Sequence, residues 1–162
     1  MIPVTLPPSR PGMVEFIQSE GQSEEARHVE AMVAEFRGHQ RVRAAFADLE
    51  AARSEAAVDG WNGHGGKAVS PRSYRQARRL LGALLMIGPE PEITIDAEGD
   101  FELDWIIGTG RALTLSISGD GRIAFAWIDG TRRGHGTEWF TGGIPAAIAT
   151  AIGDVTRSGD LR

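Results

Sequence analysis

The sequence predicts an α+β fold: a four- to five-stranded antiparallel meander packed against helices, with an N-terminal helical extension. Hydrophobic residues recur with a helical period in the first half of the chain and again near its end. Between about residues 91 and 128 they instead alternate with polar residues, and short Gly/Asp turns separate the alternating segments. The length of 162 residues is enough for one domain to bury a core of its own.

Four prolines fall in residues 1–22, which therefore predict a flexible proline-rich arm. This arm carries an apolar cluster that could dock on the domain or on a partner. The cluster contains Val14, Phe16 and Ile17.

A helical segment is predicted over residues 23–57, with Ser23 as its N-cap. Its first apolar stripe contains Val29, Val33 and Phe36, and its second contains Val42, Phe46 and Leu49. The two stripes are rotated by roughly 120° from each other at 100° per residue. Because Gly38 lies between them, we expect two helices or one helix kinked at this glycine.

The α+β domain is predicted over residues 58–157, followed by a tail at 158–162. It opens with a Gly-rich loop, and a helix then begins with Ser70 as N-cap and Pro71 at its first position. Four alternating segments follow, at 93–95, 101–107, 113–117 and 123–127. A second Gly-rich loop is expected at 130–136, a short fifth strand at 138–140, and a last helix from Pro145.

Composition excludes several classes of site. The absence of cysteine rules out disulfides, thiolate zinc sites and cysteine nucleophiles. The net charge of −5 argues against a nucleic-acid surface that covers the molecule. No signal peptide is visible, and no apolar segment approaches the roughly 20 residues that span a bilayer. We therefore expect a cytoplasmic protein that does not contact a membrane.

The most unusual local sequence is Gly60-Trp61-Asn62-Gly63-His64-Gly65-Gly66. Its glycines permit positive φ and close backbone approach, as a ligand loop requires, which makes Trp61, Asn62 and His64 candidates for interaction. The spacing matches neither a Walker loop nor a dinucleotide loop. The alternative is structural: Trp61 anchors a turn on the core and the glycines direct the chain into the next helix.

Histidines and carboxylates offer a second kind of site. If the two Gly-rich loops converge, His64 and His135 could act as an acid–base pair or bind a metal ion. No two histidines stand at i, i+3 or i, i+4, the spacing of neighbours on one helical face, and Glu102 and Asp104 are typical of a solvated strand face. We therefore assign no catalytic residue, no metal site and no cofactor.

A third kind of site is basic. Arg72, Arg75 and Arg79 share one face of the predicted helix, and Arg132 and Arg133 follow in the second Gly-rich segment. These arginines are candidates for binding an anion or a nucleic acid. A basic face opposite an apolar one is also what an ordinary amphipathic helix presents to solvent.

The segment from Trp61 to Pro71 resembles the opening of a group of small bacterial proteins with the pattern W-[DN]-G-x-G-A-x-P. Glu102-Leu103-Asp104-Trp105 and Gly136-Thr137-Glu138 are similar to later motifs of that group, so the resemblance covers about residues 60–152. The sequence departs from the pattern at Gly66, where Ala is common, and at Pro71, where proline comes sooner. The resemblance implies a shared fold and no particular activity.

These observations favour a non-enzymatic protein-interaction module, such as an adaptor, an inhibitor or a neutralising partner, with another protein as its partner. A bacterial or phage defence setting would suit such a protein. Two alternatives remain open: a small histidine- or metal-dependent hydrolase that uses the two Gly-rich loops, and a nucleic-acid or nucleotide binder that uses the arginine face.

Overall fold

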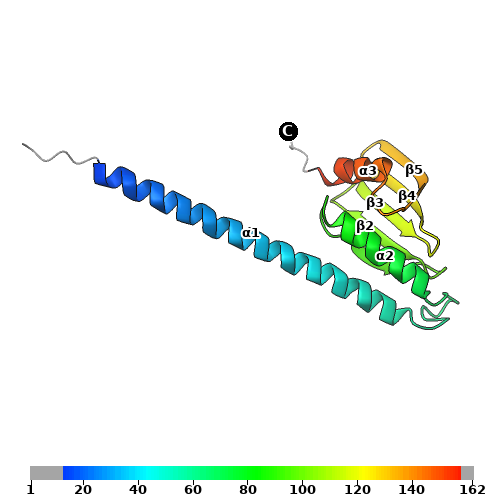
Figure 1. The fold of residues 1–162 in the computed structure, drawn as a ribbon. Helices are drawn as coiled ribbons and strands as arrows, with labels where there is room; N and C mark the ends of the chain where they lie inside the picture. Colours follow the sequence, from blue (N-terminus) through cyan, green and yellow to red (C-terminus); the bar gives the residue numbers. More distant parts are fainter. Residues whose placement is uncertain (1–12, 158–162) are drawn as a thin grey trace, which may run out of the picture. The chain divides into compact units, whose positions relative to one another are not determined.

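The computed structural model describes the backbone of residues 13–157 and the side chains of residues 24–157, which form three helices and a five-stranded sheet (Figure 1). The helices are α1 (Met13–Glu55), α2 (Pro71–Leu84) and α3 (Ala146–Thr156). The strands are β1 (Glu92–Ile95), β2 (Phe101–Ile106), β3 (Arg111–Ile117), β4 (Arg122–Asp129) and β5 (Arg132–Trp139). The chain divides into two units, Met1–Gln40 and Arg41–Arg162.

The sheet is an antiparallel meander, as the alternating pattern predicts, and the structure gives the strand order β1-β2-β3-β4-β5. Leu103 faces Leu115 across β2 and β3, and the same register pairs Phe101 with Ile117. Alternation therefore places the large apolar side chains of the central strands on one face, where they are buried. The opposite face carries mostly half-buried and exposed polar or small residues, together with the exposed side chains of Ile106, Ile128 and Trp139.

The prediction of a loop at residues 130–136 is wrong. The chain makes a tight turn at Gly130 and Thr131, and residues 132–136 belong to β5. A Cβ on Gly134 would lie 2.6 Å from the Trp127 indole nitrogen, and one on Gly136 would lie 2.8 Å from the Phe125 ring. Both glycines are paired with these aromatic residues of β4. They are therefore strand residues that leave room for two aromatic rings.

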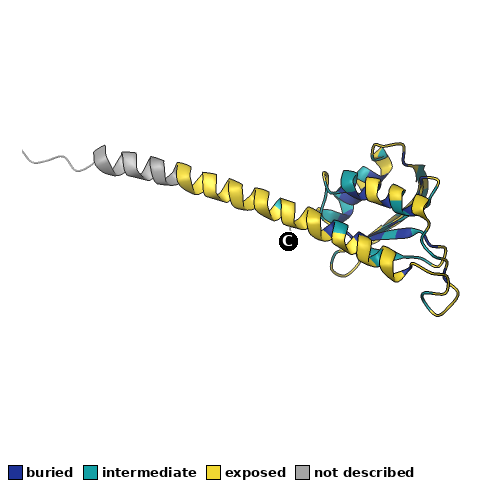
Figure 2. Cartoon of the chain, turned by 60° about the horizontal axis from the view of Figure 1, so that its bottom comes forward, coloured by how far each residue is buried: buried dark blue, intermediate teal, exposed yellow. Residues whose placement is uncertain are grey.

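Helices α2 and α3 pack on the buried face of the sheet, and Figure 2 shows the buried residues concentrated there. Helix α2 begins as predicted, because the Ser70 hydroxyl accepts a 3.0 Å hydrogen bond from the Ser73 N–H and Pro71 follows the cap. Helix α2 contributes Leu80, Leu81 and Leu84 to the core, and α3 contributes Ile148 and Ile152.

Helix α1 is continuous and is neither divided nor ended at Gly38. A glycine in a helix interior costs about 1 kcal/mol relative to alanine, which the neighbouring helix formers can tolerate. The helix also begins at Met13 rather than Ser23, so residues 13–22 are helical and not part of an extended arm. Residues 1–12 and the predicted tail at 158–162 lie outside the described residues. None of the described helices is both long enough and apolar enough to cross a membrane.

Candidate functional site

The Gly-rich loop at residues 58–69 is held by its own hydrogen bonds. The Asn62 side-chain oxygen accepts from the N–H groups of His64 and Gly66, both at 2.9 Å. Gly60 donates to the Gly66 carbonyl at 2.7 Å, while Gly60, Gly63 and Gly65 adopt positive φ. The geometry thus supports the structural interpretation, in which these glycines direct the chain through tight turns into the next helix. Positive φ at each of them is the reason that glycine is needed.

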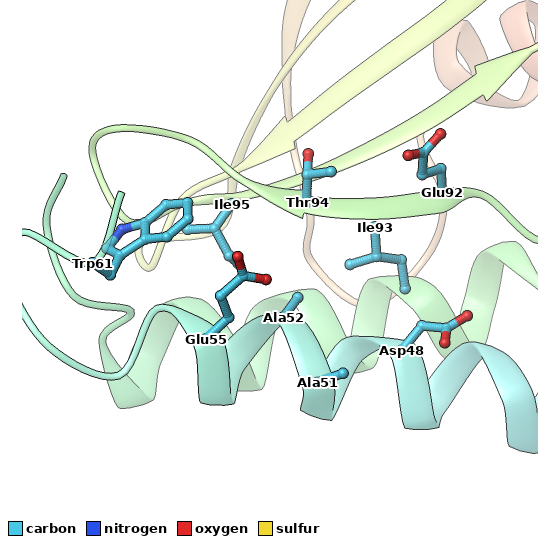
Figure 3. A pocket seen from close by; sticks show the side chains of 9 residues that line it. All are labelled: Asp48, Ala51, Ala52, Glu55, Trp61, Glu92, Ile93, Thr94 and Ile95. Carbon is cyan, nitrogen blue, oxygen red and sulfur yellow. The ribbon is translucent and has the colours of Figure 1, made fainter. Parts of the chain in front are cut away.

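This loop fixes the position of Trp61. Its indole N–H donates to the Lys67 carbonyl at 3.2 Å, and a Cβ on Gly66 would lie 2.8 Å from the same indole nitrogen. The Lys67 N–H in turn donates to the Ala97 carbonyl at 2.9 Å, which ties the loop to the β1–β2 turn. Trp61 is half-buried and closes one end of a groove beside β1 (Figure 3).

The groove has a volume of about 400 Å³ and lies between the last turns of α1 and strand β1, all within the unit Arg41–Arg162. Its helical wall has the spacing i, i+3, i+4, i+7, which places all four side chains on one face of α1. The wall consists of Asp48, Ala51, Ala52 and Glu55. The small side chains of the two alanines leave space in the middle of this wall, and the two carboxylates lie at its ends (Figure 3).

The opposite wall is the free edge of β1. Strand β1 pairs with β2 alone among the described strands. The Asp96 N–H donates to the Asp100 carbonyl at 3.0 Å, so hydrogen-bonded positions along this ladder are Asp96, Thr94 and Glu92. The intervening residues, Ile93 and Ile95, therefore direct their backbone N–H and C=O groups away from β2 and toward the groove.

Consecutive residues of β1 from both of its faces line this groove, as expected at an open strand edge. Ile93 and Ile95 point toward α1 in Figure 3, whereas Glu92 and Thr94 point to the other side. The groove thus combines an apolar surface, unpaired backbone groups and a polar rim.

The charge of the groove is negative. Asp48, Glu55 and Glu92 line it, and none of these carboxylates makes an ion pair or a hydrogen bond with a described side chain. No basic side chain in the described part of the chain lines the groove. A ligand that matches it would carry positive charge.

Asn62 and His64, the other interaction candidates of the Gly-rich loop, do not line this groove. The Asn62 side chain is engaged within the loop, and the exposed His64 ring nitrogen Nδ1 lies 2.8 Å from the Asn62 carbonyl. Val14, Phe16 and Ile17 fall on the helical backbone of α1, but their side chains lie outside the described residues.

The predicted basic residues separate into two groups. Arg72, Arg75 and Arg79 line a shallow pocket of about 300 Å³ on α2 together with Gln76 and Gly119. Neither Arg132 nor Arg133 lines this pocket. Arg132 instead pairs with Asp129 and Asp154 and lies over the Trp127 ring, and Arg133 lines a separate pocket on the outer face of the sheet.

The predicted histidine pair is not assembled. His64 lies in the loop tied to the β1–β2 turn, whereas His135 lies on β5 at the opposite edge of the sheet. Four strand spacings separate the two edges, roughly 19 Å. No group of three potential metal-ligating side chains occurs among the residues that the structure describes.

The predicted carboxylate pair lies on the outer face of β2. The Thr114 hydroxyl donates to Asp104 at 2.5 Å. Burial, followed by the neighbouring charges of Asp104 and Asp96, raises the pKa of Glu102 above its usual range. The hydrogen bond from Thr114 holds the Asp104 carboxylate, and burial with the neighbouring carboxylates explains the raised pKa of Glu102. Neither observation requires a bound substrate.

Of the residues that line the groove, the sequence indicated only Trp61 as a candidate for interaction. The other lining residues carry weak sequence signals. The spacing Asp48-x-x-Ala51-Ala52-x-x-Glu55 is visible in the sequence as a polar helical face with a small-residue centre. Only the structure shows that this face lies opposite the free edge of β1.

No protein-family model matches this chain, and neither curated proteins nor solved structures give a significant match. The resemblance of the Trp61–Pro71 segment to a bacterial group therefore stays a prediction.

Proposed function

We propose that this protein is a non-enzymatic interaction module, and that its groove receives an extended, basic segment of a partner protein along the edge of β1. The observation that carries the proposal is the unpaired edge of Ile93 and Ile95 inside a groove rimmed by carboxylates. An extended peptide can add a strand to such an edge, with main-chain hydrogen bonds for affinity and side-chain contacts for specificity.

The groove dictates the pattern of the bound segment. Side chains on one face of an added strand would contact Ile93, Ile95 and the alanines of α1, which favours small or branched apolar residues. Lysine or arginine elsewhere in the segment would approach Asp48, Glu55 and Glu92. Trp61, at one end of the groove, offers an aromatic face to an apolar or cationic side chain.

The test uses two peptides of equal length, one that alternates lysine with valine and one that alternates glutamate with valine. Titration of the full chain, followed by NMR, should show shifts of the Ile93 and Ile95 amides and of the Trp61 indole N–H with the lysine peptide only. The double variant Asp48→Lys, Glu55→Lys should lower the affinity about tenfold or more, since it reverses two charges beside the ligand.

The matched control is Glu24→Lys, which reverses an exposed carboxylate in the other unit and should leave the affinity unchanged. Preference for the glutamate peptide, or binding that the double variant does not weaken, would refute the proposed groove.

A second candidate function is the binding of nucleic acid by α2. The specific observation is that Arg72 and Arg75 line a pocket and form no ion pair with a described carboxylate. Arg72→Glu with Arg75→Glu should then abolish binding of a labelled oligonucleotide, and the wild-type affinity should fall steeply with salt. Arg79 is left in place because it lies over the Phe140 ring.

A further inference from the structure

The N-terminal unit carries an apolar stripe that no described residue covers. Its side chains lie on helix α1 at the spacing i, i+3, i+4, i+7, within about 100° of the helix circumference. The stripe consists of Val29 (58% exposed), Met32 (57%), Val33 (40%) and Phe36 (63%). Figure 2 shows this part of α1 exposed almost throughout.

Such a stripe is unfavourable in water. Helices in isolation owe little stability to propensity, and most of their stability in proteins comes from burying an amphipathic face. The exposed side chains here are large, and one of them is aromatic. A partner that covers the stripe would stabilise both the helix and the unit that contains it.

The spacing of the stripe is symmetric. The positions 29, 32, 33 and 36 read the same in both directions about a point between Met32 and Val33. A two-fold axis through this point, perpendicular to the helix, would bring the stripe onto an identical stripe that runs in the opposite direction. This is the self-complementarity that an interface between two identical chains requires.

The charges on either side select the antiparallel direction. Residues 24–31 contain three glutamates and one arginine, a net charge of −2, and residues 35–43 contain one glutamate and three arginines, a net charge of +2. An antiparallel pair places each acidic half beside a basic half, whereas a parallel pair places like charges together. One of these arginines, Arg41, also pairs with Glu90 of its own chain.

One specific contact follows from this geometry. Glu30 and Arg37 lie on the same edge of the stripe, at about 100° and 80° from Val29 around the helix. In the antiparallel arrangement, the edge of the stripe that carries Glu30 and Arg37 in one copy lies beside the same edge of the other copy. Because the helices run in opposite directions, Glu30 of each copy comes opposite Arg37 of the other. The pair would form twice, once on each side of the two-fold axis.

We infer that the chain binds a second copy of itself through Val29, Met32, Val33 and Phe36, with the two α1 helices antiparallel. This inference is independent of the proposed peptide groove, which lies in the other unit. Four side chains give a small interface compared with the roughly 800 Å² per partner of standard complexes, so we expect a reversible, concentration-dependent dimer.

Sedimentation of the full chain over a range of concentrations tests the inference. The wild type should shift from monomer to dimer, and Phe36→Ser should raise the dimer dissociation constant about tenfold or more. Val58→Ser is the matched control, because Val58 is equally exposed but lies in the other unit and should leave the dissociation constant unchanged. A wild type that stays monomeric throughout would overturn the inference.

Charge exchange tests the direction. Glu30→Arg should weaken the dimer by placing two arginines opposite each other, and the double variant Glu30→Arg, Arg37→Glu should restore it. A double variant that dimerises no better than the single one would contradict the antiparallel pairing.

The absence of cysteine allows a second test of direction by single-cysteine variants. Met32→Cys lies beside the two-fold axis and should form an intermolecular disulfide on mild oxidation, since a disulfide requires Cα atoms within about 7 Å. Gln40→Cys lies on the same side of the helix but far from the axis and should not. Cross-linking of both variants would indicate parallel helices and overturn the inference.

Discussion

The two ends of the described part of α1 show how differently the same helical pattern can be used. Residues 24–40 and 41–55 both carry apolar side chains at intervals of three and four. In the second segment Ala45 and Leu49 are buried, whereas in the first Val29 and Phe36 are more than half exposed. Periodicity therefore predicts that a helix has an apolar face, and says nothing of what covers that face.

The difference comes from the neighbours of the second segment. The Tyr74 hydroxyl of α2 donates to the Glu50 carboxylate, and the Arg53 guanidinium lies 4.5 Å from the centre of the Tyr74 ring. Arg78 lies over the Phe46 ring in the same way, at 5.4 Å from its centre. Leu49 belongs to the same buried cluster as Leu80 and Leu81 of α2, so its burial depends on α2 as much as on α1 itself.

Truncation in the two segments should produce the largest contrast. Leu49→Ala removes a fully buried side chain and should lower the free energy of unfolding by about 2–5 kcal/mol. Met32→Ala, at an exposed position, should change it by less than about 0.5 kcal/mol at concentrations where the chain is monomeric. Urea unfolding followed by far-UV circular dichroism measures both, because the signal of α1 includes the two segments. Equal losses would mean that the first segment is covered in solution even in the monomer.

The sheet and its turns could be predicted from the sequence because period-two alternation and Gly/Asp turns act locally. The segments containing Leu103, Leu113 and Ile123 therefore fall on strands as expected. The last strand was predicted only from residue 138 because its alternating positions are occupied by glycine. Gly134 and Gly136 make room for the rings of Trp127 and Phe125, a constraint that exists only once the strands are paired.

The candidate site was less accessible to prediction, since its parts are distant in the sequence. Trp61 stood out because of its Gly-rich setting, and the helix cap at Ser70 fixes the end of that loop. The free edge of β1 could not be identified, because strand order determines which edge is open. That Asp48 and Glu55 lie beside this edge follows from the packing of α1, which no local pattern specifies.

Replacement of Gly38 sharpens the comparison at the end of the first segment. A Cβ at this position would meet no atom within 4 Å, and its φ lies outside the left-handed region. Gly38→Ala should therefore stabilise α1 by up to about 1 kcal/mol, through helix propensity and reduced freedom of the unfolded chain. Circular dichroism during thermal unfolding measures the gain in helix.

The fluorescence transition of the tryptophans, all of which lie beyond residue 60, tells whether this gain reaches the second unit. An unchanged fluorescence midpoint with a raised helix midpoint would show that the two segments of α1 unfold separately. A lowered helix midpoint would contradict the continuous helix.

The smallest expected effect concerns Arg41 and Glu90, an ion pair at the start of the second segment. The Arg41 Nε donates to the Glu90 carboxylate at 2.6 Å, and this hydrogen bond is the main reason that the pKa of Glu90 is lowered. Both side chains are about half exposed, so solvent screening should limit the pair to less than about 1 kcal/mol. A lowered pKa means that the contribution is complete above the pKa of the unfolded chain and is lost as the pH falls through the folded value. A double-mutant cycle with Arg41→Gln and Glu90→Gln should thus give a favourable coupling energy at pH 7 that disappears in acid. A coupling energy that persists in acid would mean that packing rather than charge joins the two side chains.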